Sequence, residues 1–179
     1  MPSNLHDDFA AEFGHLVQGV IDSILLNMPN APRILDRRSR AVKLWEHDKS
    51  KKTRECLPDG QFMDDHASKP GLIYEVGYSQ TGDSLTKVAK DYIVGTRGAV
   101  TTVDPTSGKV QAVCDMESTM FQDSNGQMVN SSNLLKLQLT DMAKKKYSDD
   151  YPPAPVHIPF GELSRILDFA KSQAGKNSP

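Results

Sequence analysis

Residues 57–62 read Leu-Pro-Asp-Gly-Gln-Phe and residues 72–78 read Leu-Ile-Tyr-Glu-Val-Gly-Tyr, and these two segments determine the architecture of the chain. Each segment surrounds one acid, Asp59 or Glu75, with apolar residues, and the two acids stand 16 residues apart. An acid in an apolar run loses hydration unless a cation or a hydrogen-bond donor meets it. Two neighbouring strands with one acid each therefore predict a paired-carboxylate site that suits Mg²⁺.

The composition bounds the class of protein. The chain has 179 residues, of which 37% are hydrophobic and 25% are charged, as expected for one soluble domain with a sizeable core. We expect this domain over residues 1–174 and a flexible tail over residues 175–179. No apolar run approaches the roughly 20 residues that cross a bilayer, and the N-terminus lacks the features of a secretory signal. The sequence thus predicts an intracellular protein, cytoplasmic or nuclear, that is not secreted and has no membrane partner.

Several catalytic signatures are missing from the sequence. Cys56 and Cys114 are the two cysteines, with no spacing to histidine or cysteine that suits zinc, so reduced core thiols are the simplest interpretation. The sequence contains no GxSxG, GxxxxGK[ST], GxGxxG or HExxH motif. These absences argue against a serine-hydrolase triad, a nucleotide phosphate loop and a zinc peptidase.

Positive charge is concentrated in one segment although the formal net charge is −2. Residues 33–54 hold nine Lys and Arg against three acids. Such a segment can neutralise phosphates without regard to base sequence, although it can equally be a solvated hairpin. The residues that we expect to contact nucleic acid, DNA rather than RNA, are Arg37, Arg38, Arg40, Lys49, Lys51 and Lys52.

Hydrophobic periodicity predicts the order of the elements. Apolar residues recur at helical spacing early in the chain and again after Asp83, and they alternate between these two helices as they do in strands. The order of helix, three strands, helix and strand is predicted over residues 8–26, 41–47, 56–63, 72–78, 83–94 and 99–103. Further strands are expected over residues 109–116 and 135–139, separated by a polar loop over residues 122–132. A rigid connector over residues 151–155 should precede a last amphipathic helix.

This order, with Pro58-Asp59 on one strand and Glu75 on the next, resembles the PD-(D/E)XK superfamily of restriction-endonuclease-like proteins. Residues 58–62, 75–80 and 85–95 look like a set of largely uncharacterised fungal proteins, and distantly like the Uma2-type branch of the superfamily. The resemblance implies an α/β fold with a central mixed β-sheet flanked by helices. Its core order is αβββαβ, with extra strands and a C-terminal helix added.

The resemblance also implies a chemistry. Asp59 and Glu75 would coordinate one or two Mg²⁺ ions, or Mn²⁺ in their place, and would serve in metal-dependent hydrolysis of DNA phosphodiester bonds. The superfamily usually has a lysine two residues after the glutamate, and this chain has Gly77 there. Gln80, at a motif position of the related proteins, and Lys87, on the following helix, are the candidate replacements.

Each of these residues has a second interpretation that the sequence leaves open. Asp59 belongs to a Pro-Asp-Gly sequence that is common in turns, and Gln80 could cap the following helix. Helical geometry places Lys87 roughly opposite the apolar stripe that should face the sheet. The alternative function is therefore a catalytically inactive nuclease fold that binds nucleic acid or a protein partner, as a monomer or as a homodimer.

Overall fold

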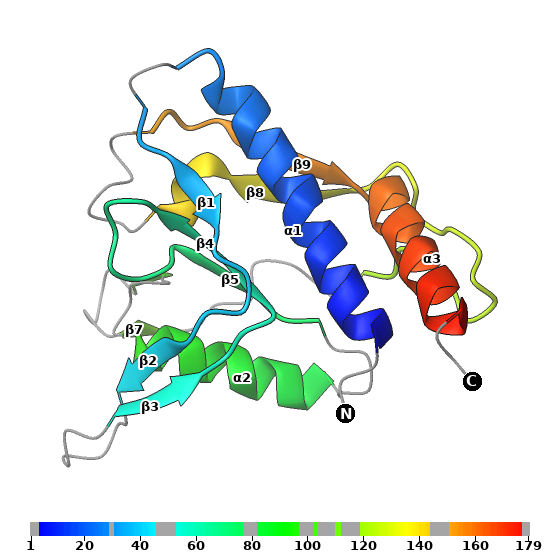
Figure 1. The fold of residues 1–179 in the computed structure, drawn as a ribbon, viewed down its shortest axis with the longest axis horizontal. Coiled ribbons are helices and arrows are strands. Elements are labelled where there is room, and N and C mark those ends of the chain that lie inside the picture. Colours follow the sequence, from blue (N-terminus) through cyan, green and yellow to red (C-terminus); the bar gives the residue numbers. More distant parts are fainter. Residues whose placement is uncertain are drawn as a thin grey trace.

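Two long helices, α1 (Asn4–Leu25) and α3 (Phe160–Lys176), lie side by side, with α1 crossing the middle of the molecule and α3 at one side of it (Figure 1). The computed structural model describes residues 4–28, 31–45, 53–76, 82–96, 102–103, 110–111, 119–143 and 151–176. The amphipathic pattern of the first helix explains its packing, because Phe13, Val17 and Ile21 repeat at i, i+4 and i+8 and are all buried. The predicted first helix is thus confirmed, although it begins at Asn4 rather than at residue 8.

A three-stranded antiparallel sheet lies under α1 and consists of β1 (Ile34–Asp36), β4 (Gly60–Asp64) and β5 (Leu72–Tyr74), with β4 in the centre. The register of β4 with β5 pairs Gly60 with Tyr74 and Phe62 with Leu72. The strand predicted over residues 56–63 is in fact interrupted. Pro58 cannot donate to a ladder and restricts the residue before it, so the chain bends between β3 (Thr53–Cys56) and β4.

A hairpin of β2 (Val42–Trp45) and β3 packs against α2 (Gly82–Gly95) in a second, smaller core (Figure 1). Val42 and Leu44 of the hairpin and Tyr92 of α2 are its buried members. Ile73 of β5 packs against the same cluster. The small core therefore connects α2 to the strand that ends just before Glu75.

The second half of the chain adds short elements. β6 (Thr102–Val103) pairs with β7 (Val110–Gln111), and β8 (Leu134–Gln138) leads through a 3₁₀ helix, η1 (Leu139–Met142), towards its partner β9 (Pro155–Pro159). The predicted connector over residues 151–155 thus ends in a strand. Alternation explains this, because Val156 and Ile158 of β9 are buried while Pro155, His157 and Pro159 are exposed.

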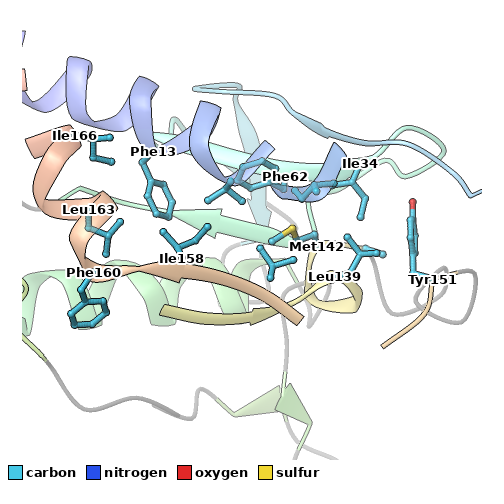
Figure 2. Close-up of a cluster of buried hydrophobic side chains, with 14 residues drawn as sticks. Phe13, Ile34, Phe62, Leu139, Met142, Tyr151, Ile158, Phe160, Leu163 and Ile166 are labelled. Carbon is cyan, nitrogen blue, oxygen red and sulfur yellow. The ribbon is translucent and has the colours of Figure 1, made fainter. Parts of the chain in front are cut away.

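The main core lies between α1, α3, β4, η1 and β9. Figure 2 shows side chains from these elements meeting there, among them Phe13, Phe62, Met142, Ile158 and Ile166. Within the described residues all pairings are antiparallel and fall into four small sheets, so the expected single mixed sheet is not formed there. The α/β class is confirmed.

In the described part of the chain no helix has the length and apolar character to cross a bilayer.

Gly60 permits a close approach that fixes the end of the β4–β5 ladder. A Cβ at Gly60 would overlap the ring of Tyr74. That ring packs edge-on against Phe13 at a centroid distance of 4.9 Å, and its hydroxyl donates to the carbonyl of Ala10 at 3.1 Å. The absence of a side chain at residue 60 thus leaves room for the Tyr74 ring, through which β5 contacts α1.

Replacement of Gly60 by alanine should therefore destabilise the protein by about 2 kcal/mol, a typical cost of overpacking. Gly19 is the matched control, since no atom lies within 4 Å of a Cβ there and it is exposed in α1. Gly19→Ala should instead stabilise by about 0.5–1 kcal/mol through helix propensity. Urea unfolding of both variants measures the difference, and equal effects would contradict the packing described for Tyr74.

Candidate functional site

The register of the β4–β5 ladder brings Asp59 and Glu75 together. Gly60 and Tyr74 form the last pair of that ladder, and Asp59 and Glu75 come one residue beyond it on the two segments. The Oδ2 atom of Asp59 accepts a hydrogen bond from the N–H of Val76 at 2.6 Å, which joins the two segments past the end of the ladder. Both acids are partly buried. The pairing that the sequence predicts is therefore present as a juxtaposition of two carboxyl groups.

Glu75 has an unusual electrostatic environment. Partial burial raises the pKa of its carboxyl group, and the adjacent Asp59 raises this pKa further through its charge and through a side-chain hydrogen bond. The Tyr92 hydroxyl acts in the opposite direction, because it donates to Oε1 of Glu75 at 2.8 Å and so favours the ionised form. The net effect is a raised pKa, so the carboxyl group of Glu75 holds a proton more readily than an isolated glutamate does.

His6, near the start of α1, is a member of the site that the sequence analysis missed. Its Nε2 lies 3.1 Å from Oδ2 of Asp59, and its Nδ1 lies 3.1 Å from Oδ1 of Asp7. Partial burial lowers the pKa of the imidazole, but the two neighbouring carboxylates outweigh it and the pKa is raised. Nothing in the local sequence indicates this contact, since it depends on where α1 crosses the sheet.

Tyr92, in the last turns of α2, is a second member of the site. The side chain is 5% exposed, and its ring belongs to the smaller core while its hydroxyl reaches Glu75. Burial, together with the hydrogen bond to Glu75, raises the pKa of the Tyr92 hydroxyl. The hydroxyl thus remains a proton donor and orients one oxygen of the glutamate.

Replacement of Tyr92 by phenylalanine removes this donor and keeps the ring in its packing. If Glu75 is a metal ligand, the affinity for Mg²⁺ should fall by about tenfold, the lower end of the effect of losing a residue that orients a ligand. Calorimetric titration of Mg²⁺ into the variant measures this fall. An unchanged affinity would show that the orientation of Glu75 by Tyr92 has no part in metal binding.

A cavity of about 550 Å³ opens beside Glu75. Leu5 and Phe9 of α1, Phe121, and Leu167 and Lys171 of α3 line it together with Glu75 and Val76. The Lys171 ammonium group donates to the side-chain oxygen of Gln122 at the wall of this cavity. Glu75 thus faces a cavity that a ligand can enter. Lys171, which is distant from Glu75 in the sequence, lines the same cavity.

Of the other two predicted catalytic residues, the structure describes Lys87 and shows no contact of it with this pair. Lys87 is exposed on α2, as its helical position predicts, whereas Tyr92 reaches Glu75 from another face of the same helix. Gln80 lies outside the described residues. The carboxyl pair, His6 and Tyr92 therefore make up the site as the described part of the chain defines it.

The cations of the basic segment, residues 33–54, have different surroundings. On the hairpin, Arg54 forms an ion pair with Asp91 at 2.6 Å and Lys43 lies 3.9 Å from Glu55. Arg38 is exposed and lies 2.7 Å from the ring of His15. Arg37 is half-buried and Arg40 is exposed. Lys49, Lys51 and Lys52 are outside the described residues.

Asp64 is buried although it belongs to a polar group of residues. The composition of Asp64, Asp65 and His66 is typical of a solvated loop, but Asp64 is the last residue of β4 and is 0% exposed. Its two oxygens accept hydrogen bonds from the Tyr151 hydroxyl at 2.5 Å and from the N–H of His66 at 2.7 Å. These three side chains are the one group in the described residues that brings three ligand atoms within 4.8 Å. Because Asp64 is completely buried and joins Tyr151 to the turn at His66, we interpret its role as structural.

Comparison with known proteins gave no match: no family model, no curated protein and no solved structure matches the chain. The interpretation of the site therefore depends on its own geometry. That geometry consists of two carboxyl groups in contact, a tyrosine and a histidine that orient them, and a cavity beside one of them.

Proposed function

We propose that the protein is a Mg²⁺-dependent nuclease of the PD-(D/E)XK type that hydrolyses phosphodiester bonds in DNA. The observation that carries the proposal is the juxtaposition of Asp59 and Glu75 one step beyond the end of the β4–β5 ladder. Two adjacent carboxylates repel each other unless a proton or a cation lies between them. A divalent metal ion relieves that repulsion at neutral pH.

The residues present fit Mg²⁺ better than a softer metal. Asp59 and Glu75 supply hard oxygen ligands, and one or two carboxylates with water and phosphate completing the shell is the usual arrangement for this ion. The other polar groups of the site orient these ligands: the Val76 N–H and His6 contact Asp59, and Tyr92 contacts Glu75. When bound, the ion would polarise the phosphate and lower the pKa of an attacking water.

The cavity beside Glu75 supports the substrate side of the proposal. Phe9 and Phe121 offer apolar surface for the nucleoside next to the cleaved bond, and Lys171 offers a positive charge for its phosphate. Lys171 would then take the place of the lysine that is absent at residue 77. Arg37, Arg38 and Arg40 supply further positive charge for the DNA backbone.

Cleavage of supercoiled plasmid DNA in Mg²⁺ or Mn²⁺ tests the proposal. The wild-type protein should cut, and Asp59→Asn should not, because the amide cannot share a cation with Glu75. Glu55→Gln is the control, as Glu55 is exposed on β3 and lies outside the carboxyl pair. Cleavage that persists in Asp59→Asn would reject the assignment.

A catalytically inactive nuclease fold is the second candidate function. The glycine at residue 77 and the exposed position of Lys87 favour it, since both remove the usual source of a catalytic lysine. This candidate predicts that the protein binds DNA or a protein partner and gives no turnover in any divalent ion. Reproducible turnover that is lost in Asp59→Asn would reject it.

A further inference from the structure

A second cavity, of about 590 Å³, lies against β2, β4 and residues 65–70. The cations that line it are Arg37, Arg40, Lys43 and Lys69, and the acid among its described lining residues is Asp65. That acid lies 3.1 Å from the ring of His66. Because most of its charged lining is positive, the cavity favours an anion.

Arg37 gives a specific reason to expect a ligand. Its Nε atom is buried and has no hydrogen-bond partner among the described residues. A buried donor of a charged group without an acceptor is unfavourable and rare in folded proteins. Lys69, by contrast, already donates to the carbonyl of Thr96 at 3.1 Å, and Lys43 lies 3.9 Å from Glu55. The buried donor at this cavity without a partner among the described residues therefore belongs to Arg37.

The backbone that carries the two arginines is held in place. Gln61 donates to the carbonyl of Arg40 at 2.6 Å, and the N–H of Arg40 donates to the carbonyl of Arg38 at 2.9 Å. Arg38 adopts a φ of 48°, a left-handed conformation that is uncommon for a residue with a side chain. The N–H of Arg38 donates to Oδ1 of Asp36 at 2.8 Å, which stabilises this turn. Arg37 and Arg40 thus stand on either side of a fixed turn at one cavity.

We propose that this cavity binds a phosphoryl group carried on a ligand of about nucleotide size. Guanidinium groups match the oxygens of a phosphate, and two of them with neighbouring lysines form a common type of phosphate site. The volume is within the range of about 300–1,000 Å³ that is usual for small-molecule sites. Val42, Met63 and Pro70 line the rest of the cavity and give apolar surface for the part of the ligand beyond the phosphate.

Binding is measured in EDTA, so the test does not depend on the metal site and the two proposals can fail separately. The probes are inorganic phosphate, a 5′-phosphorylated DNA decamer and the same decamer without that phosphate, each followed by calorimetry or fluorescence anisotropy. We expect the phosphorylated decamer to bind more tightly, as a terminal phosphate can enter a cavity. Equal binding of both decamers, lost in the variants below, would assign the cavity to backbone phosphodiesters instead.

Arg37→Gln and Arg40→Gln should each weaken binding by about tenfold or more, as expected for loss of a charged hydrogen bond. Arg33→Gln is the control, because it removes the same charge from the same segment and Arg33 does not line this cavity. Arg40 is exposed, so its variant should fold even if Arg37→Gln does not. Absence of binding by the wild-type protein, or equal weakening in the Arg33→Gln control, would overturn the proposal.

Discussion

Glu75→Gln should abolish metal-dependent DNA cleavage and, at the same time, make the metal-free protein more stable at neutral pH. Cleavage should fall by about 100-fold or more, because a metal ion contributes several kcal/mol and each 1.4 kcal/mol is a factor of ten. The gain in stability follows from the pKa of Glu75, which burial and Asp59 raise above its ordinary value of 4.5. Ionisation of this group therefore opposes folding when no cation is bound.

The gain in stability of Glu75→Gln should depend on pH. The pKa of Glu75 is higher in the folded state than the ordinary value of 4.5. Protonation of Glu75 therefore stabilises the folded wild-type protein fully below pH 4.5, and this stabilisation is lost as the pH rises through the folded-state pKa. The wild-type protein and Glu75→Gln should thus have similar melting temperatures in acid, and the variant should melt higher at neutral pH. Differential scanning calorimetry in EDTA at several pH values measures this difference.

Glu55→Gln is the matched control for Glu75→Gln. Glu55 lies on β3, its side chain is 61% exposed, and its distance of 3.9 Å from Lys43 corresponds to a weak surface pair. This control should retain cleavage and should show no pH-dependent gain in melting temperature. A variant at Glu75 that cleaved as the control does, or that melted lower than the wild type at neutral pH, would contradict the site.

Asp64→Ala should destabilise the protein more than Gly60→Ala does. Asp64 is completely buried, and its removal takes an acceptor away from the Tyr151 hydroxyl and from the N–H of His66. We expect a loss of about 3 kcal/mol, from the cost of leaving buried donors without an acceptor. In a chain of this size that loss lowers the melting temperature by about 6–12 °C.

Asp65→Ala separates this structural role from metal binding by the group Asp64, Asp65 and His66. Asp65 is exposed, so its removal should change stability by about 0.5 kcal/mol or less. Tyr151→Phe should reproduce part of the Asp64→Ala loss, because it removes one of the two hydrogen bonds. Thermal melts of the three variants, with and without Mg²⁺, measure these effects. A melting temperature that rises with Mg²⁺ in the wild type and in Glu75→Gln, but not in Asp65→Ala, would assign the metal to this group instead.

The carboxyl pair could be predicted from the sequence because its cause is local. Each acid stands in an apolar run of strand character, and an antiparallel register between the two runs is enough to bring Asp59 next to Glu75. The amphipathic helices could be predicted for a similar reason, since Phe13, Val17 and Ile21 repeat at helical spacing.

The remaining members of the site depend on contacts between distant segments. His6 reaches Asp59 only because α1 crosses the sheet near its N-terminal end, and Tyr92 reaches Glu75 because α2 packs on the hairpin. The burial of Asp64 likewise requires Tyr151, which is 87 residues away. A polar residue such as Asp64 is usually exposed to solvent, but here the hydrogen bond from Tyr151 satisfies it inside the core. Local pattern carries no information about such pairs.

The break of the second predicted strand into β3 and β4 has a different origin. The run from Cys56 to Met63 has the composition of a strand, but Pro58 removes a donor inside it and Asp59 lies at the bend. This break turns Asp59 off the end of the ladder, where its side chain can meet both Val76 and His6. Pro58 and Asp59, which interrupt the predicted strand, are therefore also the residues that bring a carboxyl group to the site.

Calorimetric titration of Mg²⁺ into the wild-type protein, Asp59→Asn and Glu75→Gln is the decisive experiment for the carboxylate site, because it measures occupancy of the carboxyl pair without requiring turnover. We expect saturable binding to the wild-type protein that is lost in each single variant. Absence of saturable binding to the wild-type protein, or binding that persists unchanged in both variants, would show that Asp59 and Glu75 do not form a metal site.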